Sequence, residues 1–274
     1  MFKIIIMAFL IFIGMVGYDN ITDKAQPTTP IQQEQQKVSK HEKSAAMALF
    51  TSLLPPKEEW PSPVHKFYLA FNMDEVIDPI RQNPNWTSLD AMSRDIPQAL
   101  IAIEDHAFYN HGAIAVEGVL RAALANINAG EVVQGGSTLT QQFVKNVFLS
   151  HEQSMERKIE EAVLSLMLED NYSKDEILEL YLNTTYFGAG STGIKQASRT
   201  YFGKAPSALT LAEAAVIASL PYAPTSLNPL ENPEGCKKRQ LLVLAAMHKY
   251  GMINQGQLAE AKTEKIRLTN GTVM

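Results

Sequence analysis

Helix-start signals of one kind recur along the second half of the chain and limit what it can fold into. In a capping box, a Ser or Thr and a Glu or Gln three residues later bond each other's backbone N–H groups at a helix N-terminus. The pairs with this spacing are Thr138 with Gln141, Ser173 with Glu176, and Thr210 with Glu213. Alternating runs of β-branched residues are scarce. The sequence therefore predicts a mainly α fold.

Apolar residues at helical spacing define where the helices should lie. The expected helices span 116–128, the residues after Thr138, 156–169, 177–182, 211–220, 240–248 and 255–262, with another start at 95–97. The apolar residues that should form the buried sides of the second and third of these helices are Phe143, Val147, Phe148, Ile159, Val163, Leu166 and Met167.

The N-terminus has an uncharged apolar run behind Lys3, which is the layout of a signal sequence. The run is shorter than the roughly 20 residues that span a bilayer comfortably. No small-x-small cleavage site or lipidation cysteine follows it. We expect residues 1–18 to be an uncleaved membrane anchor, 19–60 a polar linker that cannot bury enough apolar surface to order itself, 61–265 a globular domain and 266–274 a tail.

Composition excludes several other classes. Of the 274 residues, 46% are hydrophobic and 19% charged, which is enough for a sizeable core, and the net charge of −5 argues against nucleic acid as a partner. The single cysteine, Cys236, rules out an intramolecular disulfide and a cysteine-based zinc cluster. The basic residues Lys237, Lys238 and Arg239 follow it and could lower the pKa of its thiol, but no partner supports a nucleophile. The basic trio itself fits a solvated helix start facing anionic lipid.

Two adjacent carboxylates, Glu104 and Asp105, follow an apolar segment at 99–103. Desolvation at such an edge raises the proton affinity of a carboxylate, as a general acid or base requires. From spacing alone, a solvated helix face or a helix cap is the more common explanation of such a pair. His106 and His111 lie close by, and without further ligands they are better explained as hydrogen-bonding residues than as a metal site.

A second cluster begins at a Gly-Gly-Ser-Thr turn ending in Ser137 and Thr138. Backbone N–H groups and hydroxyls at a helix N-terminus suit an anion such as a phosphate. Lys145 lies two helical turns further on, and Gln141 and Gln142 offer amides to a hydroxyl-rich ligand. The spacing of a nucleotide P-loop is absent, and an ordinary capped helix is the alternative.

The third cluster is Arg157-Lys158-x-x-Glu161, which places Arg157 and Glu161 on one helical face. A surface ion pair worth a few tenths of a kcal/mol is the simpler interpretation. The other is a cationic clamp for a phosphate beside a second functional carboxylate.

The order of these clusters resembles a known family. Glu-Asp-x-x-Phe-x-x-His at 104–111, Gly-Gly-Ser-Thr-x-Thr-Gln-Gln-x-x-Lys-Asn at 135–146 and Arg-Lys-x-x-Glu at 157–161 come first. Ile-Leu-Glu-Leu-Tyr-Leu-Asn at 177–183 and Leu-Ala-Glu-Ala-Ala at 211–215 follow. Together they resemble the peptidoglycan glycosyltransferase (transglycosylase) domain of class A penicillin-binding proteins and of monofunctional peptidoglycan glycosyltransferases.

The resemblance implies a lysozyme-like fold with a small membrane-apposed jaw, formed in part by the 116–128 helix. It implies polymerisation of lipid II into glycan strands through inverting β-1,4 transfer, with release of undecaprenyl pyrophosphate and inhibition by moenomycin. Glu104 matches the catalytic base, and Glu161 matches a second catalytic carboxylate that helps the pyrophosphate leave, directly or through a divalent cation (Mg or Mn). Substrate-binding residues are then Asp105, His111, Ser137, Thr138, Gln141, Gln142, Lys145, Asn146, Arg157 and Lys158, with no protein metal site.

The same resemblance implies that the partners are lipid II, the growing strand, the cytoplasmic membrane and the transpeptidases of the cell-wall machinery. The chain would cross the bacterial inner membrane once, with its catalytic domain outside. Ala113 departs from the pattern, because the family usually has glycine there, and the turn after Glu104 should differ. No Ser-x-x-Lys or Lys-Thr-Gly motif occurs, so we expect no transpeptidase domain. A monofunctional enzyme and the front part of a bifunctional one both remain open.

Two other functions remain alternatives. A glycan-cleaving lytic enzyme on a lysozyme-like fold needs one acid and no pyrophosphate clamp, so Ser137, Lys145 and Arg157 argue against it. A membrane-tethered scaffold that binds glycan or lipid II needs neither Glu104 nor Glu161.

Overall fold

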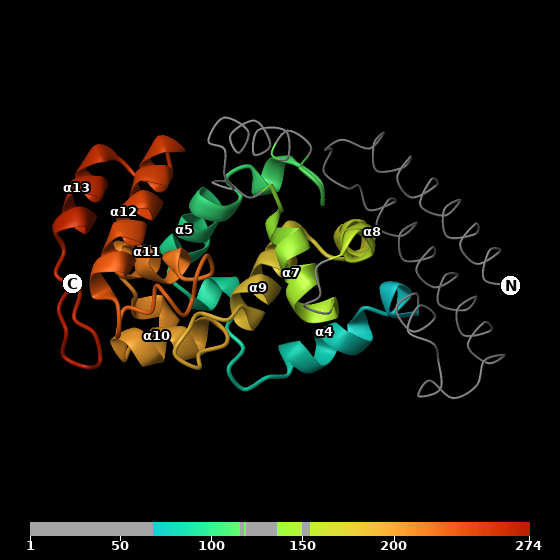
Figure 1. Ribbon diagram of the computed structural model, residues 1–274, viewed down its shortest axis with the longest axis horizontal. Helices are drawn as coiled ribbons and strands as arrows, with labels where there is room; N and C mark the ends of the chain where they lie inside the picture. Colours follow the sequence, from blue (N-terminus) through green and yellow to red (C-terminus); the bar gives the residue numbers. More distant parts are fainter. Residues whose placement is uncertain (1–67, 116–117, 119–135, 150–153) are drawn as a thin grey trace, which may run out of the picture. The chain divides into compact units, whose positions relative to one another are not determined.

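The structure is a computed structural model that describes residues 68–115, 118, 136–149 and 154–274 (Figure 1). Contacts divide the chain into Met1–Ile77 and Asp78–Met274, and every site discussed below lies in the second unit. Among the described residues the regular structure is helical, apart from isolated bridges between Tyr186 and Thr192 and between Arg267 and Val273. The prediction of a mainly α fold is confirmed.

The expected anchor and linker and nearly all of the 116–128 helix lie outside the described residues. Within the described ranges, no helix has both the length and the apolar character needed to cross a membrane.

The helices follow one another with short connections. The α-helices are α4 (Asp74–Arg81), α5 (Asp95–Glu104), α7 (Leu139–Phe148), α8 (Met155–Asn171), α9 (Lys174–Thr184), α10 (Ile194–Phe202), α11 (Leu211–Ser219), α12 (Pro233–Lys249) and α13 (Gln255–Thr263). Single 3-10 turns lie at η2 (Leu89–Ala91), η3 (Phe108–Asn110) and η4 (Pro206–Ala208).

Helix α11 is the centre of one group of helices. Every residue from Ala212 to Ser219 is buried, as expected of a helix whose apolar positions surround its axis. Its alanines let neighbouring helices approach closely, and α11 packs against α5 and α12, which also pack on each other (Figure 1). This arrangement holds α5, whose last residue is Glu104, against both α11 and α12.

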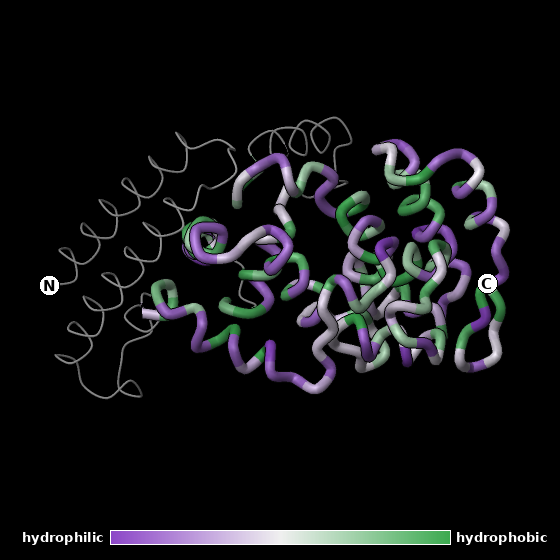
Figure 2. Tube along the Cα trace, turned by 180° about the vertical axis from the view of Figure 1, so that it is seen from behind, coloured by the Kyte–Doolittle hydropathy of each residue, from purple (hydrophilic) through white to green (hydrophobic). Residues whose placement is uncertain are grey.

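A second group consists of α7, α8 and α9, with α7 packed against both of the others. Helix α10 contacts α9 and α11 and so touches both groups. Hydrophobic and hydrophilic positions alternate along most of these helices (Figure 2), because each has one face in the core and one in solvent.

The three capping boxes expected from the sequence are confirmed. Capping boxes with both reciprocal bonds open α7, α9 and α11 at Thr138, Ser173 and Thr210. A further one opens α13 at Asn254. Each satisfies backbone N–H groups that a helix N-terminus leaves without partners.

Other expectations were incomplete or wrong. Helix α10 was not expected, and its N-cap Gly193 makes no side-chain cap bond. Helix α12 begins at Pro233, earlier than expected, behind the cap Asn232. Phe143 is fully buried and Val163 nearly so, but Ile159 is 59% exposed. Helical spacing predicts which residues share a face, but it does not predict which stretch of that face another element covers.

Candidate active site

Glu104 is the last residue of α5, and its carboxylate is held from α7. The Gln142 side-chain Nε2 donates a hydrogen bond of 3.0 Å to Glu104 Oε2. The buried Tyr181 of α9 donates a hydrogen bond of 3.0 Å to Gln142 Oε1. Because the amide oxygen accepts from Tyr181, the amide NH₂ is directed at the carboxylate. Three helices therefore fix one carboxylate oxygen.

The environment of Glu104 strengthens it as a base. Desolvation is the largest effect and raises the pKa of this carboxyl. The bond from Gln142 and the charges of Arg239 and Lys145 act in the opposite direction, and the neighbouring carboxylate of Asp105 adds to the rise. The net shift is upward, which makes the ionised carboxylate a better proton acceptor near neutral pH.

Arg239 is a functional candidate that the sequence did not single out. The basic trio lies inside α12 rather than at its start, and Arg239 is half-buried. Its guanidinium carbon lies 4.1 Å from the ring centroid of Tyr222. Among the charged groups acting on Glu104, Arg239 has the largest effect. No motif predicts this proximity, because it arises only from the packing of α12 on α5.

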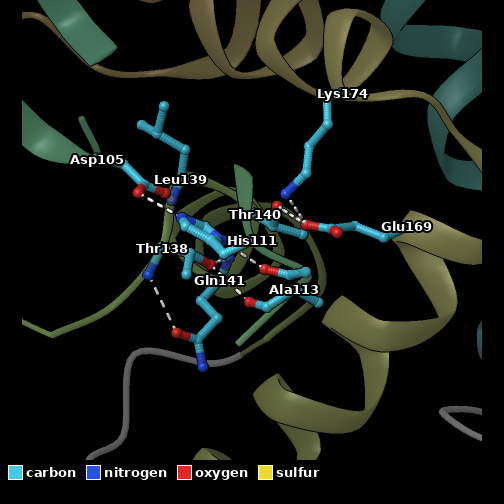
Figure 3. A network of polar contacts seen from close by, with 10 residues as sticks. Asp105, His111, Ala113, Thr138, Leu139, Thr140, Gln141, Glu169 and Lys174 are labelled. Atoms are coloured by element: carbon cyan, nitrogen blue, oxygen red, sulfur yellow. Dashed lines mark hydrogen bonds and ion pairs between the residues drawn. The ribbon is translucent and has the colours of Figure 1, made fainter. Parts of the chain in front are cut away.

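Asp105 joins the end of α5 to the start of α7. Its Oδ2 accepts a hydrogen bond of 3.0 Å from the backbone N–H of Leu139, and its Oδ1 lies 2.6 Å from His111 Nε2. Figure 3 shows Asp105 and His111 beside the first turn of α7. A carboxylate at a helix N-terminus is favourable because the first N–H groups lack intrahelical partners. Asp105 therefore organises the site.

His111 is enclosed by oxygens on both sides of its ring. Nε2 faces Asp105, and Nδ1 lies 2.6 Å from the carbonyl oxygen of Gly112. Burial by itself lowers the pKa of this imidazole, but the bonds to Asp105 and to Gly112 outweigh it, and the net pKa is raised. Both nitrogens donate only in the imidazolium form. This agrees with the hydrogen-bonding interpretation of the histidine.

Ala113, at the position where the family has glycine, is accommodated without strain. Among the described residues, the only positive φ outside glycine is at Ala189, so Ala113 does not need the conformation that glycine alone adopts freely. Its side chain is buried, and its carbonyl accepts a hydrogen bond of 2.8 Å from Thr138 Oγ1. The turn is thereby tied to the start of α7 (Figure 3).

Thr138 and Gln141 serve the fold at this point. Gln141 is buried, and its Oε1 accepts from the backbone N–H of Thr138 at 3.1 Å. Next to them, Thr140 Oγ1 donates to Glu169 at 2.5 Å, and Lys174 Nζ donates to the same oxygen at 2.7 Å. These contacts fasten α7 to α8 and α9. That Thr138 and Gln141 also bind substrate stays a prediction.

Glu161 is the second buried carboxylate, and both of its oxygens are paired. Arg157 Nη1 lies 3.2 Å from Oε2, and Lys158 Nζ contacts Oε1. Lys158 also donates to Ser137 Oγ at 3.1 Å. Glu161 is 2% exposed, so this is not the surface ion pair of the simpler interpretation. A buried carboxylate paired in this way holds two cations in fixed positions.

Helix α7 joins the two carboxylates. Gln142 of α7 bonds Glu104, while Ser137, just before α7, bonds the lysine that pairs with Glu161. Lys145 and Asn146 lie exposed on the same helix, where a ligand can reach them. The site thus has a desolvated carboxylate at one end and cations paired with a buried carboxylate at the other. Within the described residues, no three His, Cys, Asp or Glu side chains are placed to hold a metal ion.

Cys236 is not activated by the basic residues that follow it. Burial raises the pKa of its thiol to about 11, although Ser219 and Lys237 act in the opposite direction. Lys237 of the basic trio does act to lower this pKa, as expected, but burial of the thiol in the core outweighs it. Only its neighbours along the helix are partly in solvent.

Comparison with known proteins identifies the family to which these motifs are similar. The family model described as Transglycosylase matches residues 73–248. A Cupriavidus necator protein named as a transglycosylase is 41% identical over 71% of this chain and 84% of its own length. Penicillin-binding protein 1A of Neisseria flavescens is 45% identical over 68% of this chain and 23% of its own length. That of Aquifex aeolicus is 44% identical over 64% of this chain and 24% of its own. The chain thus spans about a quarter of the penicillin-binding proteins that it matches.

Proposed function

The chain belongs to the transglycosylase family, and on that premise we propose that it is a peptidoglycan glycosyltransferase that polymerises lipid II. The reaction joins the 4-hydroxyl of an acceptor sugar to the anomeric carbon of a donor that carries undecaprenyl pyrophosphate. The acceptor proton passes to a base as the new C–O bond forms. The bond to the pyrophosphate breaks with its electron pair on the leaving oxygen, and the anomeric configuration inverts.

Glu104 is the base in this proposal. Its carboxylate lies at the end of a rigid helix, its pKa is raised mainly by burial, and Gln142 directs it. Gln142 bonds one of its oxygens, and the other, which has no hydrogen-bond partner among the described residues, accepts the acceptor proton in this proposal. No nucleophile is needed, because inversion occurs in one displacement.

Arg157 and Lys158 stabilise the leaving pyrophosphate. Negative charge develops on the leaving group, so cations held in place before the reaction lower the barrier without having to reorganise. Glu161 positions both cations, and Lys145 on the exposed face of α7 adds a third. A divalent cation beside the pyrophosphate remains part of the proposal, but no step is assigned to it, because both oxygens of Glu161 already have cationic partners.

The observation that carries this proposal is that a desolvated carboxylate is directed by Gln142 of α7, while the lysine paired with a second, buried carboxylate bonds Ser137 just before α7. The test is polymerisation of purified lipid II in detergent. We expect long glycan from the wild type, no product from Glu104→Gln, and inhibition by moenomycin. Glu234→Gln, which changes an exposed carboxylate, is the matched control and should polymerise normally. Product from Glu104→Gln at the wild-type rate would exclude Glu104 as the base.

The remaining expectations stand as proposals of the same kind. They are a lysozyme-like arrangement with a membrane-apposed jaw, an anchor at residues 1–18 and a place on the outer side of the bacterial inner membrane. The growing strand and the transpeptidases are the expected partners. Fractionation of cells that produce the full chain, followed by protease treatment of intact spheroplasts, tests the location.

A further inference from the structure

Tyr222 is a large aromatic residue left in solvent at the turn between α11 and α12. It follows Pro221 at the end of α11, and its side chain is 66% exposed. The guanidinium of Arg239 covers one face of its ring, with the guanidinium carbon 4.1 Å from the centroid. With two thirds of the side chain exposed, much of the ring remains accessible to a ligand.

The turn that carries Tyr222 is held in place on both sides. The Ala223 N–H donates to the Leu220 carbonyl at 3.1 Å, and the Leu227 N–H donates to the Ala223 carbonyl at 2.9 Å. The carbonyl oxygen of Pro224 approaches Gly188 so closely that a Cβ added to this glycine would lie 2.2 Å from it. The ring is thus presented by a fixed backbone, and little ordering cost remains for a ligand that stacks on it.

Arg239, which covers this ring, belongs to α12, and α12 packs against the helix that ends at Glu104. The charge of Arg239 acts on Glu104. Within the described ranges, no hydrogen bond or ion pair engages the guanidinium, and its buried Nε has no partner. A half-buried guanidinium with unused donors commonly meets an oxygen-bearing ligand, since leaving such donors unpaired costs free energy.

We propose that Tyr222 and Arg239 form a subsite for the acceptor saccharide beside Glu104. The C–H face of a pyranose ring stacks on the accessible part of the Tyr222 ring, and Arg239 donates hydrogen bonds to oxygens of the sugar substituents. The pair would hold the acceptor so that its hydroxyl faces the base. This inference rests on the proposed function and adds to it the residues that determine how the acceptor is held.

Initial rates of lipid II polymerisation by the full chain, measured against lipid II concentration, test the subsite. We expect Tyr222→Ala to raise KM about fivefold, the effect of one lost aromatic contact, with kcat little changed. Tyr222→Trp keeps a stacking surface and should retain the wild-type KM. Leu242→Ala, which shortens another exposed apolar side chain on α12, is the control and should match the wild type.

The possible outcomes separate this inference from the proposed function. If the wild type polymerises lipid II and folded Tyr222→Ala has the wild-type KM, the subsite is excluded and the proposed function stands. If Tyr222→Ala and Tyr222→Trp raise KM equally, stacking is excluded as the cause. If the wild type does not polymerise lipid II at all, both ideas fail. Circular dichroism of each variant shows that the comparison is made between folded proteins.

Discussion

The amide of Gln142 on α7 donates a hydrogen bond of 3.0 Å to the carboxylate of Glu104 at the end of α5, 38 residues away in the sequence. The direction of this amide is set in turn by the hydroxyl of Tyr181. A residue that could have been an exposed sugar-binding amide therefore also determines how the base is held and how strongly it binds a proton.

Replacing Gln142 with Ala should move the acid limb of the pH–activity profile to higher pH. The Gln142 bond lowers the pKa of Glu104, so its loss raises that pKa further above the ordinary value. The carboxylate accepts a proton only in its ionised form, and a higher pKa means that a higher pH is needed to ionise it. The measurement is kcat/KM for lipid II across pH, because this ratio reports groups of the free enzyme.

Tyr181→Phe provides the comparison for that experiment. It leaves the Gln142 amide in place but removes the donor that orients it. We expect a shift in the same direction that is smaller than that of Gln142→Ala. An unchanged acid limb in Gln142→Ala would mean that Gln142 does not act through Glu104.

Arg239→Gln should shift the same acid limb to higher pH. The guanidinium lowers the pKa of Glu104, because a nearby positive charge favours the ionised carboxylate. Lys145→Gln should shift it in the same direction but less, since the effect of Lys145 is smaller. Raising the ionic strength should weaken both effects. If Arg239→Gln has the wild-type profile, its charge does not reach the base.

Asp105→Ala should destabilise the protein by about 3 kcal/mol. The change removes a charge-assisted bond to His111 and leaves the N–H of Leu139 at the start of α7 without its acceptor. Denaturant unfolding followed by circular dichroism measures the loss. Asp90→Ala, which changes an exposed carboxylate in η2, should leave the free energy of unfolding within about 0.5 kcal/mol of the wild type.

His111 should make stability depend on pH in a defined direction. Its pKa is raised in the folded protein, so its contribution is fully present below the unfolded value of about 6.5. That contribution is lost as pH rises through the folded pKa. The melting temperature of the wild type should therefore fall over this interval relative to His111→Gln. The exposed His248 at the end of α12 is the control, and His248→Gln should follow the wild type.

The parts of the fold that the sequence predicted are those with local causes. Capping boxes at Thr138, Ser173 and Thr210 need only residues three apart, and all three form. Helix α10 was missed because its cap, Gly193, has positive φ and offers no side-chain oxygen. Ile159 has helical spacing with Val163, but its end of α8 is left uncovered.

The residues of the site likewise fall into those that the sequence predicted and those that it did not. The motif order pointed to Glu104, Asp105 and Glu161 as one functional set, and the structure holds each in a bonded position. The contributions of Tyr181, Arg239 and Tyr222 were not predicted. Their effect depends on contacts between helices that are distant in sequence, and no spacing rule encodes such contacts.

Gly188→Ala should destabilise the protein by about 3 kcal/mol or more. Gly188 has φ of +87°, and a Cβ there would lie 2.2 Å from the Pro224 carbonyl oxygen and 2.9 Å from the Tyr201 hydroxyl. Gly190→Ala is the matched control, because its φ of +70° carries the same backbone cost with nothing within 4 Å. It should lose only about 1 kcal/mol.

Since Pro224 belongs to the turn that carries Tyr222, Gly188→Ala should also raise KM for lipid II, whereas Gly190→Ala should not. Equal losses of stability in the two variants would show that an added Cβ at Gly188 does not clash with the Pro224 carbonyl in solution.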